Sequence, residues 1–133
     1  MILVDTSVWI DFFRNRETPG VVALEAMIRD GEDLALCGVI LTEILQGIRD
    51  DRAYLLTRTR LEPLVMLPMP EAVFLRAADI YRSLRKRGIT VRKPIDCMIA
   101  AVAIENGVRL LHNDRDFDPM VEWCGLGLVS ADH

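Results

Sequence analysis

Short apolar runs alternate with longer amphipathic stretches along most of the chain. Apolar runs bounded by turn residues are typical of buried strands, so we predict strands at 2–4, 33–37, 64–67, 109–111 and 126–129. Nearly all of these runs are separated by a predicted helix, and parallel strands need such a crossover. The order of elements therefore predicts an α/β fold, with a mostly parallel sheet of four or five strands covered by helices on both faces.

Capping and breaking residues set the ends of the predicted helices. Thr6 and Ser7 can cap a first helix and Thr18 a second, because hydroxyl oxygens accept from free backbone N–H groups. The helix at 71–87 has the clearest periodicity, with an apolar stripe of Phe74, Ala77, Ala78, Tyr81 and Leu84. The other helices are expected at 39–48, 50–61, 94–107 and 114–123.

The chain is long enough for one domain and no more. It has 133 residues, 51% of them hydrophobic, so 1–133 is expected to form a single domain that needs no disulfide or metal staple. The longest apolar runs, such as 98–104, are far shorter than the ~20 residues that cross a bilayer. The start lacks the basic segment of a secretory signal, and three scattered cysteines make no disulfide framework. These features predict a cytoplasmic protein without membrane association.

The overall charge does not indicate a nucleic-acid-binding protein. Twenty acidic residues against sixteen basic ones give a net charge of −4. Fourteen of the basic residues are nevertheless arginine, which suits bidentate contacts to phosphate. A basic tract either binds RNA phosphates or is a solvated helix end, and the sequence leaves both interpretations open. It comprises Arg82, Arg85, Lys86, Arg87, Arg92 and Lys93, of which Arg85, Arg87, Arg92 and Lys93 are the candidate RNA-binding residues.

Several acidic residues occupy positions at which parallel α/β proteins build their sites. Asp5 ends the first predicted strand, and Asp114 and Asp116 follow the strand at 109–111. Asp96 falls in the first turn of the helix that begins at 94. Since the carboxyl ends of parallel strands meet at one edge of the sheet, these three segments bring carboxylates together. Glu43 is a further candidate, because an acid inside an otherwise apolar helix faces either the core or a cleft.

A cluster of carboxylates needs protonation or a bound cation to offset its repulsion. Two like charges ~4 Å apart repel by about 1 kcal/mol in water and about 4 kcal/mol near a protein surface. Carboxylate oxygens without a nearby Cys or His pair select Mg²⁺ or Mn²⁺ over Zn²⁺. Such an ion makes bound water nucleophilic and neutralises phosphate charge, so the acids predict phosphodiester hydrolysis without a protein nucleophile.

Four segments together resemble a PIN-domain ribonuclease of the VapC type, the toxin half of type II toxin–antitoxin pairs. They are ILVDTS at 2–7, LTEILQG at 41–47, PID at 94–96 with IAA at 99–101, and LLHNDRDF at 110–117. No single segment is specific, but their order and spacing match over essentially the whole chain. The resemblance implies a PIN-like three-layer α/β/α sandwich, in which the catalytic, metal-binding acids are Asp5, Glu43, Asp96 and Asp114, with Asp116 as an auxiliary acid.

The same resemblance implies an endoribonuclease that uses Mg²⁺ or Mn²⁺ and leaves 5′-phosphate and 3′-hydroxyl ends. It further implies a homodimer and a cognate antitoxin whose segment lies in a hydrophobic groove, to which Trp9, Phe12 and Phe13 can contribute. The chain departs from the family pattern at His112, where members commonly have Thr. That departure puts a secondary hydroxyl contact in doubt and leaves the acids unchanged.

Two other functions compete with this interpretation. A phosphatase or receiver-type phosphotransfer domain would use Asp5 in an Asp-x-Asp loop, but position 7 is Ser and the scheme assigns no role to Glu43. A non-catalytic module on the same fold would bind RNA or a protein partner, although all four acids are retained. RNA cleavage that depends on a divalent cation distinguishes the nuclease from both.

Overall fold

A four-stranded parallel sheet forms the centre of the protein in the computed structural model, which describes residues 1–129. The strands lie in the order β3-β2-β1-β4 and comprise β1 (Ile2–Val4), β2 (Leu34–Cys37), β3 (Val65–Leu67) and β4 (Arg109–Leu111). β1 is an inner strand, and its register pairs Ile2 with Leu34 on one side and with Arg109 on the other. Every residue of β1 and β2 is buried, as expected for strands covered on both faces.

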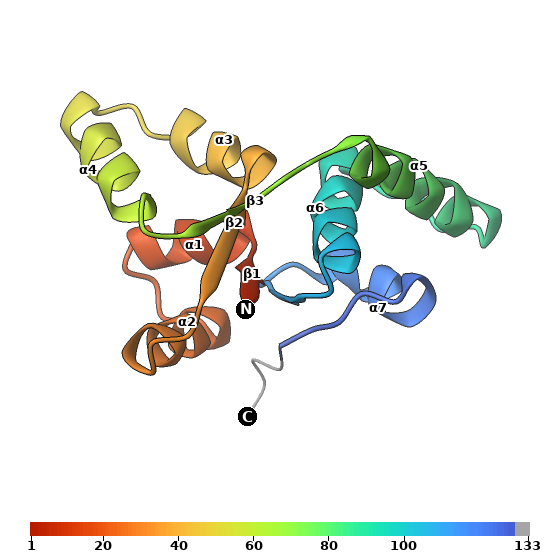
Figure 1. The fold of residues 1–133 in the computed structure, drawn as a ribbon, viewed down its shortest axis with the longest axis horizontal. Helices are drawn as coiled ribbons and strands as arrows, with labels where there is room; N and C mark the ends of the chain where they lie inside the picture. Colours follow the sequence, from red (N-terminus) through yellow and green to blue (C-terminus); the bar gives the residue numbers. More distant parts are fainter. Residues whose placement is uncertain (130–133) are drawn as a thin grey trace.

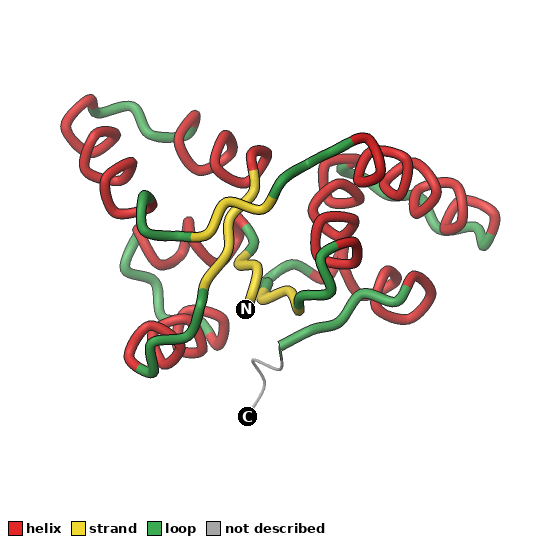
Figure 2. The backbone as a smooth tube through the Cα atoms, in the orientation of Figure 1, coloured by secondary structure: helices red, strands yellow, loops and turns green. Residues whose placement is uncertain are grey.

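Two groups of helices flank the sheet. They are α1 (Thr6–Phe13), α2 (Pro19–Arg29), α3 (Gly38–Gln46), α4 (Asp51–Leu61), α5 (Glu71–Lys86), α6 (Pro94–Glu105) and α7 (Asp118–Cys124). Figure 1 shows α1 to α4 on one side of the strands and α5 to α7 on the other, and Figure 2 shows the strands between them. This arrangement confirms the predicted α/β class. None of the helices described is long and apolar enough to cross a membrane.

Residues 126–129 do not form the fifth strand that the apolar pattern allowed. Leu128 makes one isolated parallel bridge to Leu110, whose N–H donates to Gly127 O (2.9 Å). The N–H of Leu126 instead donates to Met120 O in α7 (3.3 Å), so pairing with β4 cannot begin before Gly127. The sheet of the described chain therefore has four strands.

The buried stripe of α5 differs from the predicted one. α5 packs along α6, of whose twelve residues seven are buried. The side chains that α5 buries are Val73, Ala77, Ile80 and Leu84. Ala77 and Leu84 were expected in the core, but Phe74 is 47% exposed and Ala78 is also exposed. The prediction was wrong here because two neighbouring stripes of this helix are apolar, and the contact with α6 decides which one is covered.

Side chains cap the helix starts near the predicted positions. The N-cap of α1 is Asp5 rather than Thr6 or Ser7, because its carboxylate accepts from the backbone N–H of Ser7 (3.0 Å). Thr18 caps α2 as expected. The helix predicted at 114–123 is a 3-10 turn (Arg115–Phe117) followed by α7, because Pro119 lacks the N–H that a continuous helix would need.

Candidate metal centre

Three segments bring acidic side chains to the carboxyl edge of the sheet. Asp5 directly follows β1, and its backbone N–H donates to Leu111 O at the end of β4 (2.9 Å). Asp114 lies just beyond β4 and caps the 3-10 turn that carries Asp116. Asp96 lies in the first turn of α6. The β1–β4 pairing thus holds the first and last of these segments side by side.

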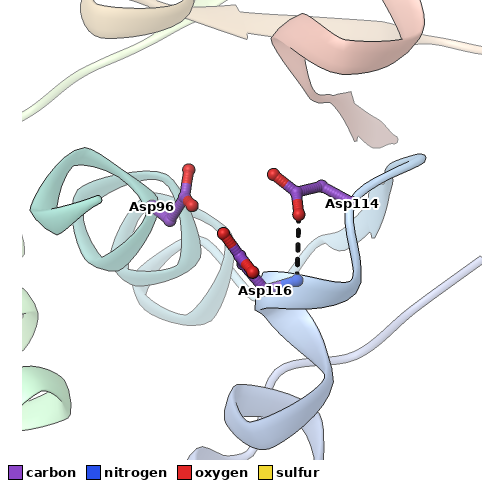
Figure 3. Close-up of side chains that lie close together, drawn as sticks. All are labelled: Asp96, Asp114 and Asp116. Atoms are coloured by element: carbon purple, nitrogen blue, oxygen red, sulfur yellow. Dashed lines mark hydrogen bonds between the residues drawn. The ribbon is translucent and has the colours of Figure 1, made fainter. Parts of the chain in front are cut away.

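Asp96, Asp114 and Asp116 form a compact group, which we call the acid triad (Figure 3). One carboxylate oxygen from each lies within 4.8 Å of the other two. Asp114 Oδ1 accepts a hydrogen bond from the backbone N–H of Asp116 (2.9 Å), which holds the two residues together. Asp96 is buried, and its Oδ2 has no hydrogen-bond partner among the described residues. Because a buried carboxylate oxygen without a partner is costly, the acid triad fits a divalent cation with oxygen ligands.

Two basic side chains reach the acid triad from the segment before α6. Lys93 Nζ lies 2.7 Å from Asp114 Oδ2, 3.7 Å from Asp96 Oδ2 and 4.0 Å from Asp116 Oδ2. Arg92 Nη2 donates to both carboxylate oxygens of Asp116, at 2.9 and 3.1 Å. These two residues of the predicted RNA-binding tract therefore lie beside the acids.

The pKa values of Asp96 and Asp114 move in opposite directions. Burial raises the pKa of Asp96 to about 7; the Lys93 ammonium opposes that rise, and the charges of Asp5, Asp114 and Asp116 add to it. The net pKa of Asp114 is lowered. Burial on its own would raise it, but the hydrogen bonds from Lys93 and from the Asp116 N–H outweigh the effect of burial. The carboxyl without a hydrogen bond is thus the one that resists ionisation.

Asp5 and Glu43 lie outside the acid triad. Asp5 Oδ2 accepts from the N–H (3.0 Å) and the hydroxyl (2.6 Å) of Ser7, and burial raises the pKa of Asp5 despite these bonds. Glu43 is half-buried on α3, where its Oε1 accepts from the Thr6 hydroxyl (2.7 Å). It also lines a cavity of about 210 Å³ between α1, α3 and α4. Of the five acids expected at the site, Asp96, Asp114 and the auxiliary Asp116 form the compact group, and Asp5 and Glu43 are not part of it.

Arg85 and Arg87 contact aromatic rings rather than the acids. The guanidinium of Arg85 lies 5.7 Å from the ring centre of Tyr81. That of Arg87 lies 3.8 Å from the ring centre of Trp123 on α7. The four candidate RNA-binding residues are therefore divided into one pair at the end of α5 and one pair at the acid triad.

Comparison with known proteins matches residues 2–121 to the PIN domain. Ribonuclease VapC11 of Mycobacterium tuberculosis is 39% identical over 132 residues, which cover 98% of each protein. This chain belongs to the VapC ribonucleases of the PIN-domain family. DNA-bound VapBC from Salmonella typhimurium has the same fold, at a TM-score of 0.79 and 18% identity over 98% of each chain. A toxin–antitoxin complex from Klebsiella pneumoniae also matches, at a TM-score of 0.76 and 21% identity over 100% of this chain and 99% of that one.

The PIN fold of this chain also depends on a polar network that the sequence did not reveal. The backbone N–H of Asn113 donates to Ser7 Oγ (3.0 Å), which itself donates to Asp5. Asn113 Nδ2 donates to Asp11 Oδ2 (3.0 Å) and Thr18 Oγ1 (2.9 Å). The network ties the loop after β4 to α1 and to the start of α2. The only signal in the sequence is a hydroxyl residue two positions after an acid at a strand end, which many helix starts share.

His112 supports the same loop in this VapC-family chain. Its Nδ1 accepts from the backbone N–H of Asp114 (3.0 Å), and its ring lies 5.0 Å from that of Phe117. Because Nδ1 accepts, the neutral ring carries its hydrogen on Nε2. Burial lowers the pKa of His112, which favours this neutral form. An imidazole therefore hydrogen-bonds the backbone at the position where the family pattern has a hydroxyl.

Proposed function

We propose that this VapC-family protein is an endoribonuclease that hydrolyses RNA phosphodiester bonds with a divalent cation, Mg²⁺ or Mn²⁺. The acid triad carries the proposal, because three carboxylate oxygens lie within 4.8 Å of one another and one side chain in the group is buried without a hydrogen-bond partner for its Oδ2. Oxygen ligands of this kind favour Mg²⁺ or Mn²⁺. Asp96, Asp114 and Asp116 would hold the ion.

The other two acids complete the site in this proposal. A bound divalent cation makes water nucleophilic and neutralises charge that develops on the phosphate. Asp5 is held by both hydrogen bonds from Ser7, so its carboxylate keeps one orientation beside the acid triad. Glu43 is fixed by the Thr6 hydroxyl at the wall of the neighbouring cavity. Both carboxylates can orient the attacking water or accept its proton, and hydrolysis would leave 5′-phosphate and 3′-hydroxyl ends.

Basic side chains beside the acids would bind the RNA backbone. Arg92 is 77% exposed and Lys93 is 52% exposed, so both can reach a phosphate at the acid triad. Arg85 and Arg87 would contact phosphates further along the strand, at the end of α5.

We also propose that a cognate antitoxin blocks this site and that the protein forms a homodimer in the cytoplasm. The Klebsiella and Salmonella structures, solved as toxin–antitoxin and VapBC assemblies, support a protein partner. The cavity of about 210 Å³ beside Glu43, lined partly by Ile10 and Phe13, supports an apolar groove for it next to the site. A second cavity, of about 410 Å³ and lined partly by Trp9 and Phe12, lies at the opposite edge of the sheet, where β2 and β3 begin. Trp9 is mainly a core residue at 4% exposure, whereas Phe12 is half-buried. The free thiols of Cys37, Cys97 and Cys124 support a reducing compartment.

The proposal is tested by RNA cleavage with and without a divalent cation. Asp114→Asn should reduce cleavage in Mg²⁺ by at least about a hundredfold, since groups that stabilise developing charge contribute 10²–10³ in rate. EDTA should abolish the wild-type activity and Mn²⁺ should restore it. Asp79→Asn, an exposed acid on α5, is the matched control and should cleave as the wild type does.

Cleavage that persists in EDTA, or that survives in Asp114→Asn, would refute the metal-dependent mechanism. Sequencing the ends of the products checks the proposed 5′-phosphate. Wild-type protein that binds RNA without cleaving it under any cation would support the non-catalytic module instead.

A further inference from the structure

Lys93 occupies the position among the carboxylates that a metal ion would need. Its ammonium contacts Asp114 Oδ2 at 2.7 Å and lies within 4.0 Å of carboxylate oxygens of Asp96 and Asp116. The acid triad is defined by oxygens of the same three residues. One positive charge from the chain is therefore shared among three negative ones.

The backbone directs the Lys93 side chain into this position. Lys93 is the N-cap of α6 with an extended conformation, and the next residue is the proline that begins the helix. Its carbonyl accepts from the backbone N–H of Asp96 (2.9 Å), so the two residues are fixed within one helical turn. From there the side chain crosses to Asp114 on the loop after β4. The contact thus joins two of the three segments that form the site.

A divalent ion bound to the same carboxylates would weaken this contact. Lys93 counteracts the repulsion among the carboxylates, and its charge lowers the pKa of both Asp96 and Asp114. A divalent ion on the same oxygens would lie within a few ångströms of the ammonium, where like charges repel. Asp114 Oδ1 already accepts from the Asp116 N–H, so a metal ion that bound Asp114 through Oδ2 would have to share that oxygen with Lys93.

We infer that Lys93 is a built-in counter-ion of the metal centre, which neutralises the acid triad in the metal-free protein and gives way when a divalent cation binds. This inference rests on the proposed metal site. It has two consequences: Lys93 weakens the apparent metal affinity, and metal binding releases an ammonium group next to the site. The nearest anion that could then bind that ammonium is the phosphate of the RNA substrate.

Arg92 does not share this role, although it is adjacent in sequence. Among the described residues, its guanidinium hydrogen-bonds only Asp116, and it is 77% exposed. Lys93 contacts all three carboxylates. A guanidinium bonded to one carboxylate can remain in place while the other two bind an ion. Lys93 would therefore compete with a metal ion for the carboxylates, whereas Arg92 would remain beside the bound ion.

Calorimetric titration of the metal-free protein with Mn²⁺ tests the inference without any measure of activity. Lys93→Met removes the charge and keeps the length of the side chain, and it should tighten Mn²⁺ binding by about tenfold, or about 1.4 kcal/mol. Lys93→Arg keeps a positive charge at the same place and should bind Mn²⁺ about as weakly as the wild type. Lys86→Met is the matched control, because it removes the same charge from an exposed position on α5.

Thermal melts of the same variants supply an independent measurement. In EDTA, Lys93→Met should melt below the wild type, because the acid triad loses its counter-ion; with Mn²⁺ it should gain more in melting temperature than the wild type does. Equal or weaker Mn²⁺ binding by Lys93→Met, or an equal gain in Lys86→Met, would overturn the role of Lys93. Failure of the wild type to bind Mn²⁺ at all would instead overturn the proposed metal site and the inference with it.

Discussion

Replacing Asp96 with asparagine should make the metal-free protein more stable above neutral pH. Asp96 is buried at 4% exposure, and its Oδ2 has no hydrogen-bond partner among the described residues. The substitution therefore removes a charge from a place that disfavours charge. Asparagine has nearly the shape of a protonated aspartic acid, so packing in the first turn of α6 should change little.

The pKa of Asp96 sets the size and the pH range of this effect. Its rise from 3.8 to about 7 means that deprotonating Asp96 costs about 4 kcal/mol more free energy in the folded state than in the unfolded state. Because folding raises this pKa, the stabilisation of the fold that comes from the protonated Asp96 is fully present below pH 3.8. It is lost as the pH rises through about 7 and the folded protein has to carry the charge. At pH 8.5 the wild type carries the whole penalty and the asparagine variant carries none. The expected gain is about 2–4 kcal/mol, or on the order of 10 °C in melting temperature.

Thermal and urea melts in EDTA between pH 5 and 8.5 measure this difference. The stability curves of the wild type and Asp96→Asn should converge as the pH falls and separate as it rises. Asp79→Asn, which removes an exposed carboxylate from α5, controls for net charge and should show no such separation. An Asp96→Asn variant that is less stable than the wild type at pH 8.5, or a difference that does not depend on pH, would refute the reasoning.

Two further predictions concern the loop after β4 and the end of α5. Gly20→Ala should destabilise the protein by about 1–3 kcal/mol in thermal melts, because the added Cβ would clash with Asn113 Oδ1. The loss should largely disappear in an Asn113→Ala background, and a loss of equal size there would contradict the steric cause. Arg85→Ala or Arg87→Ala should lower the salt dependence of RNA binding by about one unit of slope, measured by titration at several salt concentrations. An unchanged slope would mean that these arginines only stack on Tyr81 and Trp123.

The sheet was largely predictable from the sequence because its strands are continuous apolar runs. β1 and β4 were expected at the residues where they lie, and the acids that follow them were expected at one edge. That inference needs only the rule that parallel strands end at the same side. The position of Asp5, Asp96 and Asp114 along the chain therefore carried most of the information about the site.

The arrangement of side chains within the site was not predictable in the same way. Nothing in the sequence shows that Lys93 reaches Asp114, since the contact depends on how the start of α6 faces the loop after β4. The resemblance implied Asp116 as an auxiliary acid, but its place in the acid triad depends on the 3-10 turn, which was expected to be helix. The prediction of the buried face of α5 was wrong for a related reason, because packing against α6 decides which of two apolar faces is covered. Local sequence patterns therefore predict where helices and strands lie, whereas the side-chain contacts within the site depend on how distant helices and strands pack together.

The sheet order also has a consequence for when the protein can become active. β1 is synthesised before the other three strands of the described sheet, but it pairs with the last of them, β4, where Ile2 lies opposite Arg109. Asp114 can approach Asp5 only after β4 has joined the sheet. A nascent or truncated chain that lacks β4 can fold its first helices and still hold no complete set of acids. The connectivity itself thus delays assembly of the acids until β4 has been synthesised and paired with β1.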